Sequence, residues 1–564
     1  MPTYTLTFLD TVGIQNYVFG SNVLRENIGA SELVRRATRL WPFEEVRKAG
    51  KTNVKPGRDL AGDPDDLDDN LRIEDGDLTA EVIYAGGGNC AVLFANRDAA
   101  RDFVTRLSRR VLAEAPDLDL VAVHVEMNWK SDALADKMKE AIDRLATKKQ
   151  ERRVSTPLLG LSTTVNCRST GLPAVGTDAD EPDLKPKEAP TRPLSAGILA
   201  KLRFLKPANE RLANYLPLFG DAGLEVPHDF DHFGREAGEI SYIAVVHADG
   251  NGMGSRIEDL RDDFPHPEDN RLYIRAMRDF SKAVEVASLQ ALSDVSTLLL
   301  RHWNPVKDKD AIIGKTQDGW GEWVEVGKVS LGKEKGRLYA PFRPIVFGGD
   351  DLTFVTDGRL GLGLAAAYLE AFEKAMNAQD NKFTKGIRAC AGASVVKAHY
   401  PFARACDLAY DLCSNAKKTW DRKHSALDWH FAATGLFGTV EAIRLRQYTT
   451  PDGHLEMRPV LLEEQPGSWR SWTGFARVTK EFLIGEEWKD KRNKVIALRQ
   501  ALREGPEAVA RFRSAYGLKP LPPLAAGIEA LQTTGWDGTG RCGYFDAVEA
   551  LDFFTPLDWG KEAA

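Results

Sequence analysis

One order of predicted elements occurs twice along this chain, which restricts it to folds built from two similar units. The first copy begins with the apolar strand YTLTFLD at 4–10 and reaches a glycine-rich hairpin at 82–94. The second copy begins with YIAVVHAD at 242–249 and reaches a hairpin at 345–356. In both copies a helix separates strand from hairpin, and a helix, a strand and a lysine-containing helix follow the hairpin. The repeat predicts two homologous domains.

The rest of the chain fits around these two copies. Its 564 residues correspond to three or four domains, and the alternation of strands and helices indicates an α/β or α+β fold. About twenty extra residues near 304–340 lengthen the second copy. The predicted domains are a first unit, an interdomain segment, a second unit and a mostly helical C-terminal domain, at 1–165, 166–235, 236–431 and 432–564.

Composition excludes several classes of protein. The net charge of −7 argues against a whole-protein clamp on nucleic acid, although it leaves room for a local basic groove. The six cysteines are scattered without a CxxC pair, which argues against a zinc site or a disulfide framework. The N-terminus lacks a signal-peptide pattern, and no apolar run approaches the length of a membrane span. We therefore expect a cytoplasmic protein without a membrane partner.

The second hairpin, FGGDDL, places two adjacent carboxylates at its tip. Gly348 and Gly349 supply backbone freedom without side-chain bulk, so a ligand can come close to Asp350 and Asp351. Adjacent carboxylates raise one another's pKa unless a cation compensates. A plain turn is the alternative, since glycine and aspartate are common turn residues.

A third carboxylate, Asp249, ends the strand that opens the same copy. If the two strands are neighbours in one sheet, Asp249 and the hairpin acids converge. Oxygen ligands without histidine or cysteine favour Mg²⁺ or Mn²⁺, and two such ions are the usual clamp for nucleotidyl transfer. The sequence thus predicts Asp249, Asp350 and Asp351 as metal-binding and catalytic residues.

The residues around the acids are suited to a triphosphate. Glycines after Asp249 let backbone N–H groups approach phosphates at a helix N-terminus, and a later lysine can neutralise them. The predicted nucleotide-binding residues are Gly250, Asn251, Gly252, Gly254, Gly348, Gly349 and Lys417. Lys417 taken alone is more often a solvated helix residue. The first hairpin, AGGGNC at 85–90, has no acid and cannot hold metals in this way.

The combination resembles the palm domains of the large, polymerase-like subunit of type III CRISPR effector complexes, especially the Cmr type. GGDEF diguanylate cyclases and class III nucleotide cyclases are wider relatives. The resemblance covers about residues 1–430, and several unusual strings carry it: FLDTVGIQNYVFGSNVLRENIGASELV, TPLLGLSTTVNCRSTGLPAV, ADGNGMG, FGGDD, CAGASVVKAHYPFARACDLAYDLCSNAK and HSALDWHF.

The resemblance implies an α+β fold with two ferredoxin-like palm domains facing each other. It implies that the second palm joins ATP 3′–5′ into cyclic oligoadenylate with a divalent metal on Asp249 and the hairpin acids. Asp350 would be the favoured direct ligand of the hairpin pair, and Lys417 would contact phosphate. The first palm would bind the acceptor nucleotide or only buttress the site. CRISPR effector subunits, crRNA and target RNA are the implied partners.

Three departures from the resemblance stand out. The first palm begins at residue 3, so we expect no N-terminal HD nuclease domain, and the HD dipeptide at 228–229 is interpreted as an ordinary linker pair. Zinc-knuckle cysteines are missing between the palms. Asn251 stands where many relatives have a second aspartate, which weakens one metal contact.

Three rival interpretations remain open from the sequence. They are a catalytically silent scaffold for the crRNA complex, a stand-alone cyclic-nucleotide synthase, and an enzyme like the diguanylate cyclases. The intact acids argue against the scaffold, and the paired palms argue against the last. Basic runs at 148–153 and 489–494 could touch RNA phosphates, but solvated helix faces are the favoured interpretation. The acidic stretch at 60–70 is predicted to be a solvated loop.

Overall fold

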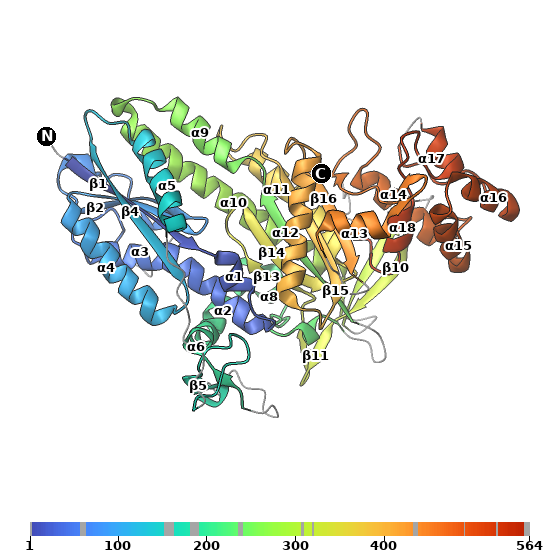
Figure 1. Ribbon diagram of the computed structural model, residues 1–564, viewed down its shortest axis with the longest axis horizontal. Coiled ribbons are helices and arrows are strands. Elements are labelled where there is room, and N and C mark those ends of the chain that lie inside the picture. The colour runs from blue at the N-terminus through green and yellow to red at the C-terminus, as the bar shows by residue number, and fades with distance from the viewer. Residues whose placement is uncertain are drawn as a thin grey trace.

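Two α/β units and a helical C-terminal region follow one another in space as they do in the chain (Figure 1). The structure is a computed structural model. It describes residues 3–56, 64–151, 163–180, 191–220, 222–234, 241–305, 310–317, 321–432, 438–489, 491–525 and 528–557. The α+β class with two ferredoxin-like palm domains is confirmed. The exact domain boundaries stay a prediction.

The first palm is a four-stranded antiparallel sheet in the order β2-β3-β1-β4. Its strands are β1 (Thr3–Val12), β2 (Ala80–Gly86), β3 (Asn89–Phe94) and β4 (Asp119–Asn128). Its helices are α1 (Ile14–Phe19), α2 (Leu24–Arg35), α3 (Trp41–Arg47), α4 (Arg97–Glu114) and α5 (Leu134–Glu151). This strand order, with α2 and α4 as the crossovers, is that of a ferredoxin-like fold.

The second palm repeats this order as β13-β14-β7-β15 and extends it with two further strands, β16 and β19. β16 runs parallel to β15, and β19 runs antiparallel to β16. The strands are β7 (Tyr242–Gly250), β13 (Phe342–Val346), β14 (Asp351–Asp357), β15 (Ala389–Lys397), β16 (Ala426–Ala432) and β19 (Val460–Leu461). The helices are α9 (Met253–Asp263), α10 (Asn270–His302), α11 (Gly361–Ala378) and α12 (Phe402–Thr419).

Helices cover both faces of the second sheet, which explains its nearly continuous apolar strands. Ala244, Val246 and Ala248 of β7 belong to the same buried cluster as residues of α10 and α11. Ile243 and Val245 belong to a cluster that includes residues of α12. The odd-numbered residues of β7 therefore face α12, because side chains alternate along a strand.

The insertion near 304–340 forms small sheets beside the second palm. They contain β8 (Trp303–Asn304), β9 (Ala311–Gln317), β10 (Trp323–Ser330), β11 (Gly332–Glu334) and β12 (Arg337–Tyr339).

The segment between the palms contacts both of them, because its first two helices pack on α2 and its last helix packs on α10. It contains β5 (Gly176–Thr177), β6 (Pro193–Leu194), α6 (Ala196–Arg203), α7 (Leu205–Tyr215) and α8 (Pro217–Gly220). Gly29 of α2 allows a close approach of α6, since a Cβ there would lie 1.7 Å from the Lys201 carbonyl oxygen. The HD dipeptide begins a helical turn, where the Asp229 side chain accepts a hydrogen bond from the Asp231 N–H.

The C-terminal region is mostly helical, as predicted. It contains α13 (Val440–Gln447), β17 (Thr449–Thr450), β18 (Gly453–His454), α14 (Trp472–Ile484), α15 (Arg492–Arg503), α16 (Pro506–Tyr516), α17 (Glu529–Thr534) and α18 (Phe545–Ala550). Because β19 also comes from this region, the C-terminal domain shares a sheet with the second palm.

Each palm packs its helical layer against the other palm. The Ser31 hydroxyl of α2 donates to the Ile345 carbonyl of β13 at 2.6 Å, and the Arg39 guanidinium bonds both Glu285 carboxylate oxygens of α10 at 2.8 Å. On the other side, α10 lies against β2, where the Arg278 Nε donates to the Ile83 carbonyl at 3.0 Å. The two palms thus face each other as predicted.

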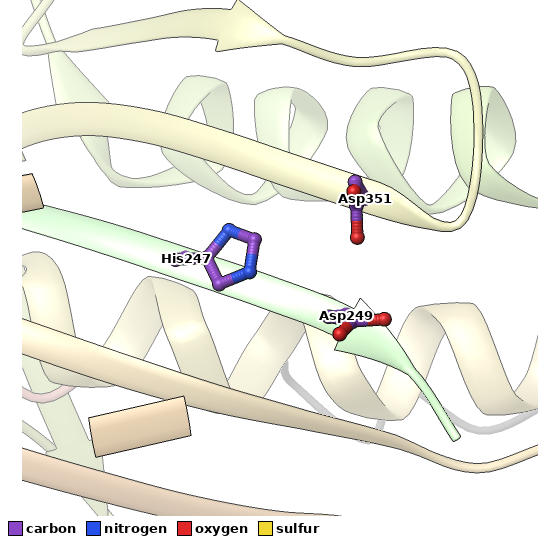
Figure 2. A group of neighbouring side chains, drawn as sticks. All are labelled: His247, Asp249 and Asp351. Atoms are coloured by element: carbon purple, nitrogen blue, oxygen red, sulfur yellow. The ribbon is translucent and has the colours of Figure 1, made fainter. Parts of the chain in front are cut away.

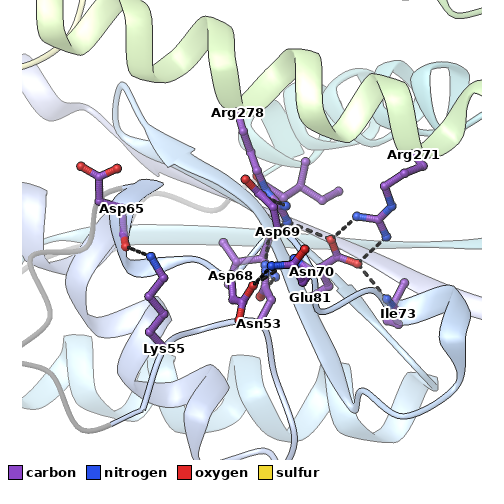
Figure 3. A network of polar contacts seen from close by, with 12 residues as sticks. Asn53, Lys55, Asp65, Asp68, Asp69, Asn70, Ile73, Glu81, Arg271 and Arg278 are labelled. Carbon is purple, nitrogen blue, oxygen red and sulfur yellow. Dashed lines mark hydrogen bonds and ion pairs between the residues drawn. The ribbon is translucent and has the colours of Figure 1, made fainter.

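The prediction of a solvated loop for the acidic stretch at 60–70 holds only in part among the residues that the structure describes, because Asp65 and Asp69 are exposed but also form ion pairs. The Arg278 Nη1 donates to the Asp69 carboxylate at 2.7 Å (Figure 3). Lys282 pairs with Asp65. Asp66 is buried. Arg271 and Arg278 also bind the buried Glu81. These acids hold α10 of the second palm against the first.

Helix α10 is long and apolar enough to cross a membrane by length and composition, in contrast to the sequence-based expectation. The span in question runs from Pro267 to His302, and 56% of its apolar window is buried inside the protein. A core helix passes the same test, and α10 packs along α11 and β2. We interpret it as a core helix.

Candidate functional site

The candidate site lies where β7 ends in the middle of the second sheet. Asp249 is directly opposite Asp351 of β14 in the strand register, and His247 is opposite Thr353. Because these residues alternate with the apolar ones, all lie on the face covered by α12. Ligand atoms of His247, Asp249 and Asp351 lie within 4.8 Å of one another (Figure 2). The convergence of strand-end and hairpin acids predicted from the sequence is therefore present.

Lys417 reaches the same point from α12. Its Nζ lies 2.6 Å from Asp249 Oδ2 and donates to the Gly250 carbonyl at 3.1 Å. The side chain is only 11% exposed, so the interpretation as a solvated helix residue does not apply to this lysine. It supplies one positive charge beside three carboxylates.

The hairpin carboxylates have raised pKa values, which cations bound beside them would lower. Withdrawal from water by the surrounding chain, and then the charge of Asp249, raises the pKa of Asp350 to about 6. The same withdrawal, followed by the charges of Asp350 and Asp249, raises the pKa of Asp351 well above its usual value. Lys417 lowers both pKa values but does not restore them. A divalent ion would offset the repulsion, and the oxygen donors suit Mg²⁺ or Mn²⁺.

Asp350 and Asp351 have different places in the hairpin. Asp351 is the first residue of β14 and joins Asp249 in the ligand cluster, whereas Asp350 precedes the strand. Asp350 belongs to the turn, in which Gly348 adopts a φ of +96° that favours glycine. The structure therefore favours Asp351 as the direct partner of Asp249, in contrast to the expectation for Asp350.

The loop after β7 leads into α9 and is open to a ligand. Gly252 has a φ of +72° and precedes the first residue of α9. A Cβ at Gly254 or at Gly349 of the hairpin would meet no atom within 4 Å. By contrast, Gly250 is packed, since a Cβ there would lie 2.7 Å from the Met253 Cε. The N-terminus of α9 thus borders an open space beside the acids.

Asn251 is the exception among the predicted nucleotide-binding residues. It is buried, and its amide Nδ2 donates to the His424 carbonyl at 3.1 Å and lies 3.5 Å from the Cys390 Sγ. These contacts tie the loop to β15 and to the chain just before β16. The structure gives Asn251 an anchoring role, and its contact with nucleotide stays a prediction.

His247 is the residue that sequence reasoning missed, because only oxygen ligands were considered. Its Nδ1 shares a hydrogen bond with the Thr353 hydroxyl at 3.1 Å, and the other ring nitrogen lies on the side of Asp249 (Figure 2). Burial lowers the pKa of His247 to about 4, so the imidazole is neutral at pH 7 and can bind a metal. The sequence did contain a signal for this residue: His247 is two positions before Asp249 in the same strand, so the two side chains lie on the same face of the sheet.

The first palm keeps part of this arrangement. Asp10 of β1 lies opposite Asn89 of β3, as Asp249 lies opposite Asp351. Lys149 of α5 places its Nζ 2.6 Å from Asp10 Oδ2, the same distance as in the Lys417–Asp249 pair. The hairpin between β2 and β3 has no carboxylate at its tip, so the lysine faces one acid there instead of three.

Comparison with known proteins identifies a family and several structures that this chain resembles. Residues 242–426 match the family described as Cas10/Cmr2, second palm domain. Among solved structures, Csm1 in T. onnurineus has a TM-score of 0.50 at 12% identity, with 99% of this chain and 70% of that chain covered. The Csm1–Csm4 subcomplex in the type III-A CRISPR-Csm interference complex gives a TM-score of 0.50 at 12% identity, covering 98% and 70%.

A third solved structure is a Csm1–Csm4 cassette in complex with AMPPNP, with a TM-score of 0.49 at 12% identity and coverage of 98% and 69%. The likeness to the two structures with a TM-score of 0.50 supports the fold alone, because both are only 12% identical to this chain. No curated protein matches the sequence.

Proposed function

Residues 242–426 belong to the Cas10/Cmr2 second palm domain family, and from this premise we propose that the chain joins ATP into cyclic oligoadenylate as the large subunit of a type III CRISPR complex. The observation that carries the proposal is the meeting of Asp249, Asp351 and His247 with Lys417 at one end of the second sheet. A fold alone would not need these acids, because the first palm forms the same hairpin without them.

In the proposed reaction the 3′-oxygen of one ATP attacks the α-phosphorus of another. The new 3′–5′ ester bond forms as the bond from the α-phosphorus to the β-phosphate oxygen breaks, pyrophosphate leaves, and the hydroxyl proton passes to solvent. Asp249 and Asp351, with Asp350 and His247 beside them, would hold Mg²⁺ or Mn²⁺. When bound, two such ions lower the pKa of the attacking hydroxyl and stabilise the charge on the leaving group.

The chain's other residues would bind and orient the phosphates. Lys417 is poised to exchange its Asp249 partner for a phosphate oxygen once a metal neutralises that acid. The glycine loop and the N-terminus of α9 would present backbone N–H groups to the triphosphate. His247 is poorly suited to act as a general base, since burial lowers its pKa to about 4 and Thr353 shares its Nδ1.

The test is to incubate the purified chain with each nucleoside triphosphate and Mg²⁺ or Mn²⁺, and to identify the products by chromatography and mass spectrometry. We expect cyclic oligoadenylate and pyrophosphate from ATP. The variants Asp351→Ala and Lys417→Ala should lose at least about a hundredfold of the turnover. Exposed Asp143 of α5 offers a matched control, since Asp143→Ala should leave turnover unchanged.

Further arms of the assay separate the rival functions. The assay is run with and without partner subunits, crRNA and target RNA. If no nucleotide is consumed in either case, the chain is a catalytically silent scaffold. Turnover that needs no partner or RNA would indicate a stand-alone synthase. A product from GTP alone would indicate an enzyme like the diguanylate cyclases.

We propose CRISPR subunits, crRNA and target RNA as partners, supported by the solved Csm1–Csm4 subcomplex of a type III-A complex, whose fold the chain shares. Because ATP and crRNA are cytoplasmic, we also propose a cytoplasmic location, which cell fractionation tests. The described part of the basic run at 148–153 gives little support for RNA contact, because its lysines already have partners in the chain. Lys148 bonds the Ala122 carbonyl, and Lys149 bonds Asp10.

A further inference from the structure

A polar cavity lies at the junction of α12 with the C-terminal domain, and none of its lining residues belongs to the second-palm acids. It has a volume of about 400 Å³. Its walls come from α12, α13, the chain around β18 and two later segments of the C-terminal domain. The lining residues are Asn415, Thr419, Val440, Glu441, Arg444, Leu445, His454, Glu456, Arg458, Pro459, Arg470 and Arg541.

Four arginines line this cavity against two glutamates. Arg470 and Arg541 direct their hydrogen bonds to neutral groups: Arg470 donates to the Met457 and Pro459 carbonyls, and Arg541 donates to the Glu456 carbonyl. The nearest carboxylate contact of Arg541 is with Glu456 at 3.8 Å. Within the described part of the chain, Arg470 thus has no ion pair, and Arg541 has only this long contact with Glu456.

The other two arginines are buried with unused hydrogen-bonding groups. Among the described residues, all three guanidinium nitrogens of Arg458 are buried without a hydrogen bond, and its closest carboxylate contacts are 3.5 Å to Asp546 and 3.6 Å to Glu549. Arg444 binds Asp428 through Nη2, but its Nε is likewise buried without a partner. Buried donors without partners are rare in folded proteins, and an unseen ligand or ion is one of their explanations.

The local charges point the same way. Burial, and then the charge of Arg541, lowers the pKa of Arg470 to about 10. Burial raises the pKa of Glu456, and the charges of Arg458 and Arg444 lower it. An anion held between Arg470 and Arg541 would relieve the repulsion between the two guanidinium groups.

From these observations we propose that the cavity is a second ligand site, which binds a phosphate-bearing small molecule of nucleotide size. Guanidinium groups match phosphate oxygens with paired hydrogen bonds. The volume falls in the range of small-ligand pockets. Val440, Leu445 and Pro459 give the cavity an apolar wall for a base or ribose. The site is separate from the second-palm acids, so it does not rest on the proposed catalytic function.

Calorimetric titration of the full chain without divalent metal tests the proposal. The probes are ATP, pyrophosphate, inorganic phosphate and adenosine. We expect ATP and pyrophosphate to bind with a Kd below about 100 μM. We expect adenosine to bind at least about tenfold more weakly than ATP, since phosphate supplies the recognition. Equal binding of ATP and adenosine would overturn the proposal, as would no binding of either phosphate compound.

Variants assign the binding to this cavity. The double change Arg470→Gln/Arg541→Gln should weaken ATP binding by at least about tenfold. Arg541→Gln alone, at a side chain that is 27% exposed, serves if the double variant unfolds. Arg511→Gln is the matched control, because Arg511 is 71% exposed on α16 and lies outside the lining residues. Unchanged binding in both cavity variants would overturn the proposal.

Two further measurements separate this site from the palm site. Asp351→Ala/Lys417→Ala should retain ATP binding at the cavity, and loss of all binding in this variant would assign the signal to the palm and overturn the proposal. Hydrogen exchange with ATP present should show protection in α13 and in residues 453–459. Protection confined to the palm loop at 249–254 would also overturn it.

Discussion

At the scale of single residues, the period of two in β7 builds the candidate site. Ile243 and Val245 fill the core under α12, and the next two odd positions, His247 and Asp249, continue the same face to the end of the strand. The same strand thus supplies both core residues and site residues without a change in its backbone geometry. This arrangement has an electrostatic cost, because the carboxylates of Asp249 and Asp351 lie opposite each other on neighbouring strands.

Asp351→Asn should therefore stabilise the metal-free protein while it abolishes activity. The pKa of Asp351 is raised in the fold, so its ionised form opposes folding once the pH exceeds the unfolded value near 4. Since Asp351 keeps contact with solvent, we expect a gain of up to about 1 kcal/mol in unfolding free energy at pH 7. The gain should vanish below about pH 4. Urea denaturation in EDTA measures it, and a lower stability at pH 7 would contradict the prediction.

His247→Gln should change which metal the site prefers. A neutral imidazole favours transition-metal ions over Mg²⁺, so loss of the ring should weaken Mn²⁺ binding by about tenfold and Mg²⁺ binding by less. Paramagnetic resonance of free Mn²⁺ measures the first affinity, and competition with Mg²⁺ the second. His124→Gln is the control, because His124 bonds Thr7 at 2.9 Å in the first sheet away from these acids. Equal losses for both ions would argue that His247 only packs.

At the scale of elements, α10 joins the two palms. It packs along α11 within the second palm, while Arg271 and Arg278 bind the buried Glu81 of the first (Figure 3). Burial alone would raise the pKa of Glu81, but the hydrogen bond from Arg271 and the charges of both arginines outweigh it and lower the pKa. Glu81 thus stays ionised inside the interface.

Glu81→Gln should lower the unfolding free energy by about 3 kcal/mol at pH 7, because it leaves two arginines without their buried partner. A carboxyl with a lowered folded pKa stabilises above its unfolded value near 4.5 and loses this contribution as the pH falls. The difference from the natural chain should therefore shrink below pH 4.5. Thermal unfolding across this range measures it. Glu126→Gln, at a side chain that is 57% exposed, is the control.

At the scale of the whole molecule, shared cores join regions that the repeat suggests are separate. One buried cluster contains Leu9 and Val92 of the first palm together with Val245 and Val355 of the second. Another contains residues of the second palm and of the C-terminal helices. The regions therefore stabilise one another through apolar contacts.

We expect the three regions to unfold in one cooperative transition. Calorimetry should show a single peak whose measured enthalpy equals the van't Hoff enthalpy. Hydrogen exchange should give the slowest amides of β1, β7 and α14 the same opening free energy. A separate, lower transition confined to 440–557 would contradict this expectation.

Local sequence patterns predicted two homologous domains, the acids at the strand ends and Lys417, because strand period and turn chemistry act over a few residues. The family resemblance, and not the local pattern, predicted that the two domains are palms. They did not predict contacts between distant segments. Asp69 and Arg278 are 209 residues apart, and no local pattern pairs them. β19 joins β16 across an intervening helix, and the arginine cavity gathers residues from 415 to 541. His247 was missed for a different reason, since the oxygen donors seemed sufficient.

The pair Asp10–Lys149 of the first palm has a consequence for engineering. Asn89 lies opposite Asp10, and its side-chain oxygen is buried without a hydrogen-bond partner among the described residues. The single change Asn89→Asp would place a second carboxylate there, in the relation that Asp351 has to Asp249. The backbone and the lysine are already in place, so this change would supply the second acid of a transplanted metal centre. Phe8 and Gly88 stand where the second palm has His247 and Asp350, so a full copy of the site would need those two changes as well.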